Sequence, residues 1–366
     1  MNRIFVGGIG LAALLLGGCQ TTKVGPRALR SFQGAYNQAV TMNENEQLLQ
    51  NIVRLRYRDN PVFMEVSAIK QDNAGNNNGE LSLDKTIMSA GGKYVGKTVS
   101  KLGFNSNNSS SLSFSRLNGK DFVQKLMTPV QLPIIISMFN SGWKPERVFN
   151  LCVERVNDLY NAPTADGPTP EYAPEYKSFY RWTTLLGRLE RNHCIDFGED
   201  PDANFSDYFV RIRSNKALDK EIAEFKTLAG LKQDRTMFKL KSDFICADEK
   251  RVTLRGRTLL GMFFFLSQGV DVPQADKDKG LVTITKNLDG SEFDWNPITR
   301  CLLKIHFSES KATVRPANAY VACRYRGKWF YIDDCDTESK STFLLLSQIY
   351  VLQSANFKSQ QSVLVL

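Results

Sequence analysis

The chain has 366 residues, of which 42% are hydrophobic and 11% aromatic; this composition allows a sizeable folded core and excludes a disordered chain. It contains only two histidines, so a histidine-rich metal centre is also excluded. The formal net charge of +9 at pH 7 favours either an anionic surface nearby or simply a well-solvated basic surface.

The N-terminus has the pattern of an export signal. A short basic start precedes the apolar run 4–16, and small residues follow before a cysteine. The tetrapeptide 16–19, Leu-Gly-Gly-Cys, resembles the lipobox of bacterial lipoproteins. The resemblance implies that residues 1–18 are a signal peptide and that Cys19 becomes the first mature residue, carrying acyl chains such as palmitate.

The same resemblance implies a cellular address. Lipoproteins with Asp after the lipidated cysteine tend to stay in the inner membrane, whereas Gln20 in this chain indicates the outer membrane. Two or three acyl chains hold a protein durably on a bilayer, with the folded body in the periplasm or on the cell surface. We therefore expect the membrane as one partner and envelope proteins or further copies of the chain as others. Nucleic acid, nucleotides and other cofactors are not expected.

The remaining cysteines are even in number, as expected of disulfides in an oxidising compartment. The six are Cys152, Cys194, Cys246, Cys301, Cys323 and Cys335. We predict at least one bridge among Cys301, Cys323 and Cys335, because they flank what look like neighbouring strands. The alternative is that several are buried free thiols, since Cys152 sits among apolar residues at helical spacing.

The first element predicted in the mature chain is a helix over about 43–57, where apolar residues recur with helical period. Asn60 and Pro61 end it. Three arginines crowd its last turns: Arg54, Arg56 and Arg58. Cations there suit the negative pole of the helix, and an anion site is the alternative.

Residues 62–117 are predicted to form a long β-hairpin. The segment 62–69 is typical of a strand, and short segments of alternating apolar and polar residues flank Asn-, Gly- and Ser-rich runs. We expect a surface hairpin or a flexible arm. Alternatively, several copies form a pore from residues 80–117, which requires strands of about nine to eleven residues.

Further elements follow from periodicity and from proline and glycine punctuation. Helices are predicted over 122–127, 133–139, 145–159, 177–191, 218–228, 254–268 and 339–352. Strands are predicted over 208–213, 237–244, 281–285, 302–307, 320–325, 329–332 and 362–366, with a hairpin turn at Arg326-Gly327-Lys328.

The predicted fold class is α+β, with a helical N-terminal region that carries the hairpin and a mixed C-terminal domain. The predicted order is a signal peptide (1–18), a tether (19–35), a helical domain (36–160) with the hairpin at about 62–117, a proline-rich linker (161–174) and an α+β domain (175–366).

One segment of the sequence matches a nucleotide-binding motif. Residues 91–98, Gly-Gly-Lys-Tyr-Val-Gly-Lys-Thr, match G-x-x-x-x-G-K-T. That loop works between a buried strand and a helix, and residues 99–111 are β-branched and rich in Asn and Ser, which makes a poor helix. We therefore predict no nucleotide site.

Two polar clusters are candidates for chemistry. His193 and Cys194 precede a run of acidic residues without calcium-loop spacing, and adjacent side chains usually point apart, so a polar turn is predicted. The second cluster consists of Asp333, Asp334 and Asp336. These carboxylates precede a predicted helix and suit its positive pole, and a catalytic carboxylate pair is the alternative.

Segments 51–57 with Pro61, 332–334 and 339–343 resemble stretches of uncharacterised proteobacterial lipoproteins, a family that brings no activity to transfer. The preferred function is a non-enzymatic structural or assembly component of a cell-envelope complex. The alternatives are a tethered hydrolase of cell-wall or surface polymer, using Asp333 or the Cys194/His193 pair, and the oligomeric pore.

Overall fold

The computed structural model describes residues 26–72, 80–88, 94–103, 109–117, 119–199, 207–242, 248–309 and 314–354. The predicted signal peptide, Cys19, Cys246 and the predicted strand 362–366 lie outside these ranges. Within them, no helix combines the length and the apolar character that crossing a membrane requires. The boundary between the two compact units of the chain falls between Glu46 and Gln47, inside helix α2 (Pro26–Arg56).

Helix α2 is longer than the sequence predicted. It begins at Pro26 rather than near residue 43, so residues 26–35 of the predicted tether are helical. Proline is well suited to the first turn of a helix, because its fixed φ is helical and the missing N–H would have no partner there.

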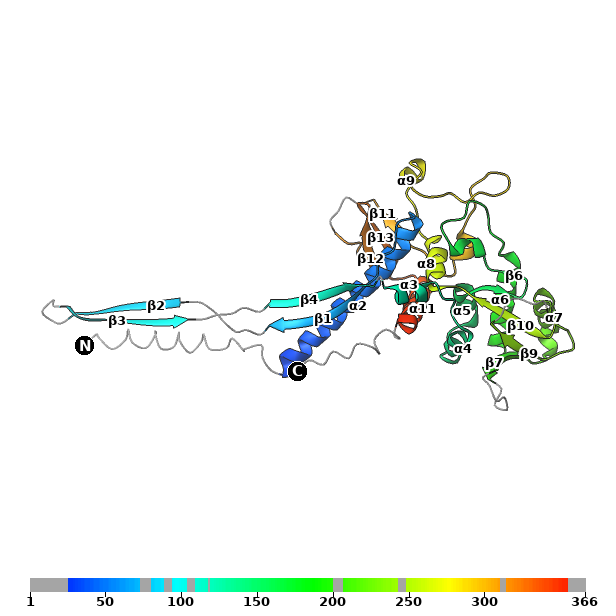
Figure 1. Cartoon of the computed structure of the whole chain (residues 1–366), viewed down its shortest axis with the longest axis horizontal. Coiled ribbons are helices and arrows are strands. Elements are labelled where there is room, and N and C mark those ends of the chain that lie inside the picture. The colour runs from blue at the N-terminus through cyan, green and yellow to red at the C-terminus, as the bar shows by residue number, and fades with distance from the viewer. Residues whose placement is uncertain are drawn as a thin grey trace, which may run out of the picture. The chain divides into compact units, whose positions relative to one another are not determined.

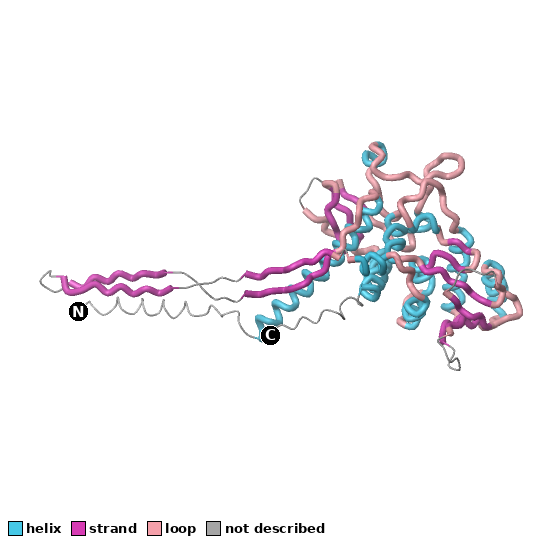
Figure 2. Tube along the Cα trace, viewed as in Figure 1, coloured by secondary structure: helices cyan, strands magenta, loops and turns pink. Residues whose placement is uncertain are grey.

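The predicted hairpin is confirmed as four antiparallel strands. They are β1 (Met64–Asp72), β2 (Glu80–Met88), β3 (Tyr94–Gly103) and β4 (Ser109–Arg116). Strand β1 pairs with β4, and β2 pairs with β3, so that one pair is nested inside the other along the chain (Figures 1 and 2). We call these four strands the ribbon.

Short helices follow the ribbon, as predicted: α3 (Lys120–Leu126), α4 (Leu132–Asn140) and α5 (Pro145–Cys152). The prediction that the third of these runs to residue 159 is wrong. After Cys152 the chain forms β5 (Val153–Val156) and β6 (Leu159–Tyr160), which pair with each other. The amide of Asn161 donates hydrogen bonds to the carbonyl oxygens of Asn150 (3.0 Å) and Val153 (2.7 Å), so side-chain donors replace further helical turns.

A six-stranded sheet takes strands from both sides of residues 161–174, where a linker was expected. Its order is β6-β5-β10-β9-β8-β7, and only β9 and β10 run parallel. The added strands are β7 (Ile195–Glu199), β8 (Tyr208–Ile212), β9 (Met237–Lys241) and β10 (Arg251–Gly256). Helices α6 (Lys177–Arg191) and α7 (Asp219–Leu228) contact each other, and the short helices η1 (Pro163–Asp166) and η2 (Lys216–Leu218) complete this region.

The single helix predicted over 254–268 is two elements. Strand β10 ends at Gly256, and α8 (Leu259–Ser267) begins after Thr258, whose hydroxyl accepts a hydrogen bond from the N–H of Gly261 at 2.9 Å. A threonine cap of this kind starts a new helix and explains the break.

The last part of the chain forms a three-stranded antiparallel sheet of order β11-β13-β12. The strands of this sheet are β11 (His306–Ser308), β12 (Ala319–Tyr325) and β13 (Lys328–Asp333). The helices of this part of the chain are α9 (Gln274–Asp278), α10 (Asn296–Thr299) and α11 (Thr337–Ser354). The predicted turn is confirmed, since Arg326 and Gly327 have φ of 47° and 81°. The strand predicted over 281–285 is not formed. Next to this segment, Lys286 makes isolated β-bridges with Tyr172 and Glu292. The predicted α+β class is confirmed.

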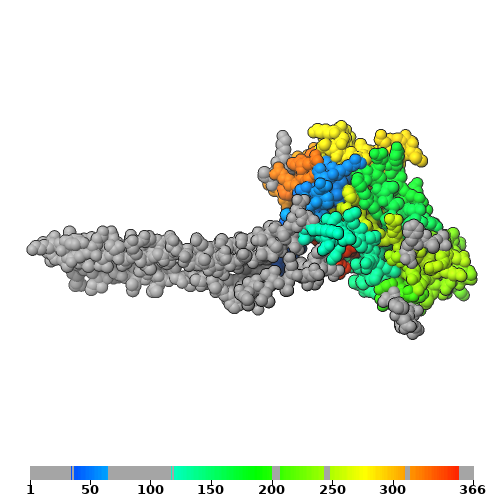
Figure 3. Space-filling model, in the orientation of Figure 1, coloured from blue at the N-terminus to red at the C-terminus, as the bar shows by residue number. Residues whose placement is uncertain are grey.

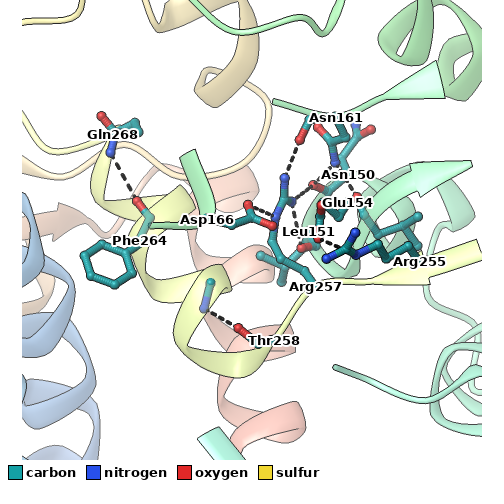
Figure 4. Close-up of polar contacts among 12 residues, drawn as sticks. Asn150, Leu151, Glu154, Asn161, Asp166, Arg255, Arg257, Thr258, Phe264 and Gln268 are labelled. Carbon is teal, nitrogen blue, oxygen red and sulfur yellow. Dashed lines mark hydrogen bonds and ion pairs between the residues drawn. The ribbon is translucent and has the colours of Figure 1, made fainter. Parts of the chain in front are cut away.

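Arg257 is the fully buried polar centre of the core (Figure 4). Its guanidinium pairs with Asp166 of η1 and donates to the carbonyl oxygens of Asn150 and Leu151, both at 3.1 Å, and of Asn161. It also lies 3.7 Å from the ring centroid of Phe265. Burial raises the pKa of Asp166 to about 7, against the attraction of Arg257. These contacts hold α5, η1 and α8 together.

Replacing Arg257 by Met should lower the free energy of unfolding by about 3–5 kcal/mol, because Asp166 then remains buried without its cation. Chemical denaturation followed by tryptophan fluorescence measures this. The control is Arg255→Met, two residues away, whose more exposed guanidinium pairs with Glu154 at 3.3 Å and whose loss should cost at most about 1 kcal/mol. The double variant Arg257→Met with Asp166→Leu should regain part of the loss. Equal small losses at both arginines would refute the central role of Arg257.

Candidate functional site

The phosphate-binding pattern of residues 91–98 does not form a phosphate loop. Lys97 and Thr98 lie within strand β3 and pair with Thr86 and Lys85 of β2. A lysine and a threonine inside a strand cannot open a helix toward a phosphate.

No disulfide joins any two of the five described cysteines, so the bridge predicted among Cys301, Cys323 and Cys335 is not formed. Cys323 pairs with Phe330, whereas Cys335 follows Asp333, which pairs with Ala319 at the other end of the hairpin. Four strand residues separate these positions by about 13 Å. Disulfides need Cα atoms less than about 7 Å apart, which explains why Cys323 and Cys335 do not pair.

The polar clusters serve local structure. The thiol of Cys194 is buried, donates to the carbonyl oxygen of Asn192 at 3.3 Å and accepts from the amide of Asn215 at 3.5 Å. Asp336 accepts hydrogen bonds from the N–H (3.0 Å) and hydroxyl (2.6 Å) of Ser339 in the first turn of α11. The helix-terminus interpretation of this aspartate is confirmed. No group of three or more His, Cys, Asp or Glu side chains in the described ranges is arranged to hold a metal.

The base of the ribbon is tied to α2 by two amide side chains one turn apart. Asn51 accepts from the N–H of Val62 at 2.8 Å and donates to its carbonyl oxygen at 2.9 Å. Gln47 makes the same pair of contacts with Met64, at 2.9 and 3.2 Å. The N–H of Leu117 donates to the carbonyl oxygen of Phe63 at 2.9 Å, which closes the base from the other side.

The register of β1 and β4 separates apolar from polar residues. Residues directly opposite each other share a face of an antiparallel pair. Val66 lies opposite Phe114 and Ile69 opposite Leu112, and the register shift between Val66 and Ala68 keeps both apolar pairs on one face. The other face of β4 carries serines at positions 109, 111, 113 and 115. In β2 and β3, Leu81 likewise lies opposite Leu102.

A polar cavity lies beyond the C-terminal end of α2. Its volume is about 410 Å³. Its walls come from the ends of α2 and α8, the segment 270–272, residues 292–299 and the start of the three-stranded sheet. Figure 3 shows the surface of residues around 50 (blue) beside that of residues 270–290 (yellow) and that of the three-stranded sheet (orange). We call this cavity the Arg56 pocket.

Arg56, the last residue of α2, lines the pocket and is only 6% exposed. Its Nη1 donates to the hydroxyl of Thr169 (3.2 Å), the side-chain oxygen of Gln268 (3.4 Å) and the carbonyl oxygen of Thr283 (3.3 Å). Its buried Nε has no hydrogen-bond partner among the described residues. Burial lowers the pKa of Arg56 to about 10, which Glu292 partly offsets, so the guanidinium is still charged at neutral pH.

The carboxylates of the pocket already have partners. Glu292 pairs with Lys277 at 2.6 Å, and Asp271 pairs with Lys304 at 2.6 Å. Asp294 accepts from the backbone N–H (2.9 Å) and side-chain amide (2.7 Å) of the neighbouring Asn296. The apolar part of the wall consists of Val270, Val272, Phe293, Trp295 and Phe307.

A close backbone approach positions Asp271. The N–H of Ile305 donates to the carbonyl oxygen of Gly269 at 2.9 Å, and the N–H of Asp271 donates to the carbonyl oxygen of Ile305 at 2.8 Å. A Cβ at Gly269 would collide with the carbonyl oxygen of Leu303, so only glycine allows this approach. Asp271 thereby meets His306 and Lys304.

Comparison of the chain with protein-family models, curated proteins and solved structures gave no match.

The imidazole of His306 should titrate above its ordinary pKa of 6.5, because Asp271 lies 3.2 Å from its Nδ1 and favours the protonated ring over the cost of burial. Burial alone would raise the pKa of Asp271, but hydrogen bonds from His306 and Lys304 outweigh it and lower that pKa. Asp271→Asn should lower the pKa of His306, since burial and Lys304 still oppose the charged ring and only the weaker attraction of Asp333 still favours it. Proton NMR resolves this, because the chain contains only one histidine besides His306. An unchanged His306 midpoint in Asp271→Asn would contradict the pairing.

Replacing Asn51 by Leu should lower the free energy of unfolding by about 1–3 kcal/mol. The N–H and carbonyl groups of Val62 would lose their hydrogen-bond partner, and the side chain of Asn51 that supplies it is buried. Gln47→Leu is the matched control, since the same two bonds to Met64 are exposed and their loss should cost less than about 1 kcal/mol. Thermal and chemical denaturation compare the two. Equal losses in the free energy of unfolding for the two variants would show that burial does not make the hydrogen bonds of Asn51 stronger than those of Gln47.

Proposed function

We propose that this protein is a lipid-anchored component of the bacterial outer membrane that assembles with further copies of itself and acts by structure rather than by catalysis. The anchor is the predicted lipid on Cys19, and the assembly element is the ribbon.

The observation that carries the proposal is the ribbon. A two-stranded antiparallel sheet is marginally stable by itself in water, and stability comes from further strands or from packing of an apolar face. Within the described residues, β1 and β4 pair with each other alone, as do β2 and β3, so each strand keeps one edge without a strand partner. Such edges invite pairing with another chain.

The register supports the same function. The large apolar residues Val66, Ile69, Leu112 and Phe114 fall on one face of β1 and β4, and the other face carries four serines of β4 together with Ala68. This is the pattern of a sheet that buries one side. The amides of Gln47 and Asn51 tie the base of the ribbon to α2. A ribbon engaged with its neighbours would therefore be fixed to the helix that follows the predicted anchor in sequence.

The hydrolase alternative has less support. The Cys194 thiol is buried and hydrogen-bonded to Asn192 and Asn215, and Asp333 accepts hydrogen bonds from the side chain of Asn318 and the N–H of Cys335. These contacts use the proposed catalytic groups for local structure. The pore from residues 80–117 requires the same assembly of copies and stays a prediction.

Native mass spectrometry of the full-length protein, extracted from membranes in mild detergent, tests the proposal. Wild-type protein should show several chains, each with the added mass of acyl groups on Cys19. Leu112→Glu should yield single chains, because it places a charge on the apolar face of β4. Ser113→Glu, the adjacent position on the polar face, is the control and should keep the assembly.

Each part of the proposal has its own adverse result. A single-chain mass for lipidated wild-type protein would overturn assembly and leave the anchor. An unlipidated chain that still assembles would overturn the anchor and leave the ribbon. Loss of assembly in both glutamate variants would show that face polarity is not the cause.

A further inference from the structure

We propose that the Arg56 pocket binds a ligand carrying a single carboxylate on an apolar or aromatic group. This inference is independent of the anchor and of assembly through the ribbon. The carboxylate would pair with the guanidinium of Arg56, and the apolar group would lie against the aromatic wall.

Three arginines are buried in the described part of the chain: Arg56 (6% exposed), Arg147 (7%) and Arg257 (0%). Arg147 pairs with Glu338, and Arg257 pairs with Asp166. Arg56 forms no ion pair with any described residue, and its three hydrogen bonds go to neutral oxygens. Buried charges are costly unless paired, so Arg56 lacks the anion that the other two have.

The second step is the geometry of the guanidinium. All three bonds of Arg56 leave from Nη1, whereas Nε is buried without a partner. The edge formed by Nε and Nη2 therefore has no partner among the described residues. Two parallel N–H groups on such an edge match the two oxygens of a carboxylate. This side chain lines the pocket. Because Nε is itself covered by protein atoms, a carboxylate reaches the Nε–Nη2 edge through a small movement of the Arg56 side chain.

The third step is the charge of the pocket. The neighbouring cations Lys277 and Lys304 are held by Glu292 and Asp271 at 2.6 Å each. Asp294 also lines the wall. Lys277 and Lys304 offset Glu292 and Asp271, so among the described wall residues Asp294 is the one carboxylate without a cation partner. Its charge disfavours a doubly charged phosphate more than a ligand with a single negative charge.

The fourth step is size and polarity. A volume of about 410 Å³ lies within the range of ligand pockets, which mostly run from about 300 to 1,000 Å³. Phe293 and Trp295 meet edge to face with ring centroids 5.1 Å apart, and Phe307 adds a further ring to the wall. An apolar group of the ligand would contact these rings while its carboxylate reaches Arg56.

Saturation-transfer NMR on the full-length protein in deuterated detergent tests the inference with benzoate as the probe. Benzoate should bind saturably and at least about tenfold more tightly than benzamide, which has the same shape without the charge, and than acetate, which lacks the ring. Inorganic phosphate should not displace it. Equal binding of benzoate and benzamide, or displacement by an equal concentration of phosphate, would overturn the carboxylate assignment.

Arg56→Gln should weaken the binding of benzoate at least about tenfold and leave the binding of benzamide unchanged, because only the charged probe pairs with the guanidinium. Lys279→Gln is the control, since this exposed lysine does not line the pocket, and it should change benzoate binding less than about threefold. The ligand-free Arg56→Gln protein should unfold at the same midpoint as wild type or higher, because an unpaired buried charge is removed.

Arg56→Lys keeps the test decisive if Arg56→Gln does not fold. It retains the charge but lacks the two-donor edge, and it should bind benzoate more weakly than wild type with benzamide unaffected. Benzoate binding of wild-type strength in either variant would overturn the role of Arg56.

Discussion

The buried ion pair of Arg257 and Asp166 is the constraint on which the arrangement of the body depends. A fully buried guanidinium is tolerated only when its charge is paired and its donors are satisfied. Arg257 meets that condition by collecting Asp166 and the carbonyl oxygens of Asn150, Leu151 and Asn161 (Figure 4). These groups come from three separate segments, which therefore have to meet at one point.

The consequence extends along α8 to the pocket. Arg257 lies just before this helix, and Gln268 follows its other end. The side-chain amide of Gln268 donates to the carbonyl oxygen of Phe264 at 3.2 Å, and its oxygen accepts from Arg56 at 3.4 Å. Arg257 thus fixes one end of α8, and Gln268 at the other end accepts a hydrogen bond from Arg56.

Features set by local sequence were predictable. Pro145 begins α5 as expected, the Arg326-Gly327 turn has positive φ, and α6 occupies the predicted range. The end of α5 was not predictable, because it depends on side-chain donors beyond the helix: Asn161, which lies 8 residues after Val153, and Arg257, which lies 107 residues after Asn150. A period of apolar residues does not reveal which side chain will satisfy a distant carbonyl. The same limit explains the bridge wrongly predicted for the cysteines.

The candidate site was only partly visible in the sequence. The arginines at the end of α2 indicated either a helix terminus or an anion site, but their burial could not be read from their spacing. Arg58 is exposed, whereas Arg56 is buried, and the difference depends on Thr169, Gln268 and Thr283. A residue that breaks the rule of paired buried charge, when two others obey it, is the kind of exception expected at a functional site.

Residues 51–57 show why the end of α2 leaves little freedom for substitution. Asn51 holds the base of the ribbon, and Arg56 lines the pocket. Tyr57 donates to Asp276 at 2.8 Å, which joins the helix end to α9. The remaining buried positions of the segment belong to the core: Ile52, Val53 and Leu55. Residues 51–57 therefore serve the ribbon, the core and the pocket, so substitutions at neighbouring positions of this stretch act on different parts of the protein.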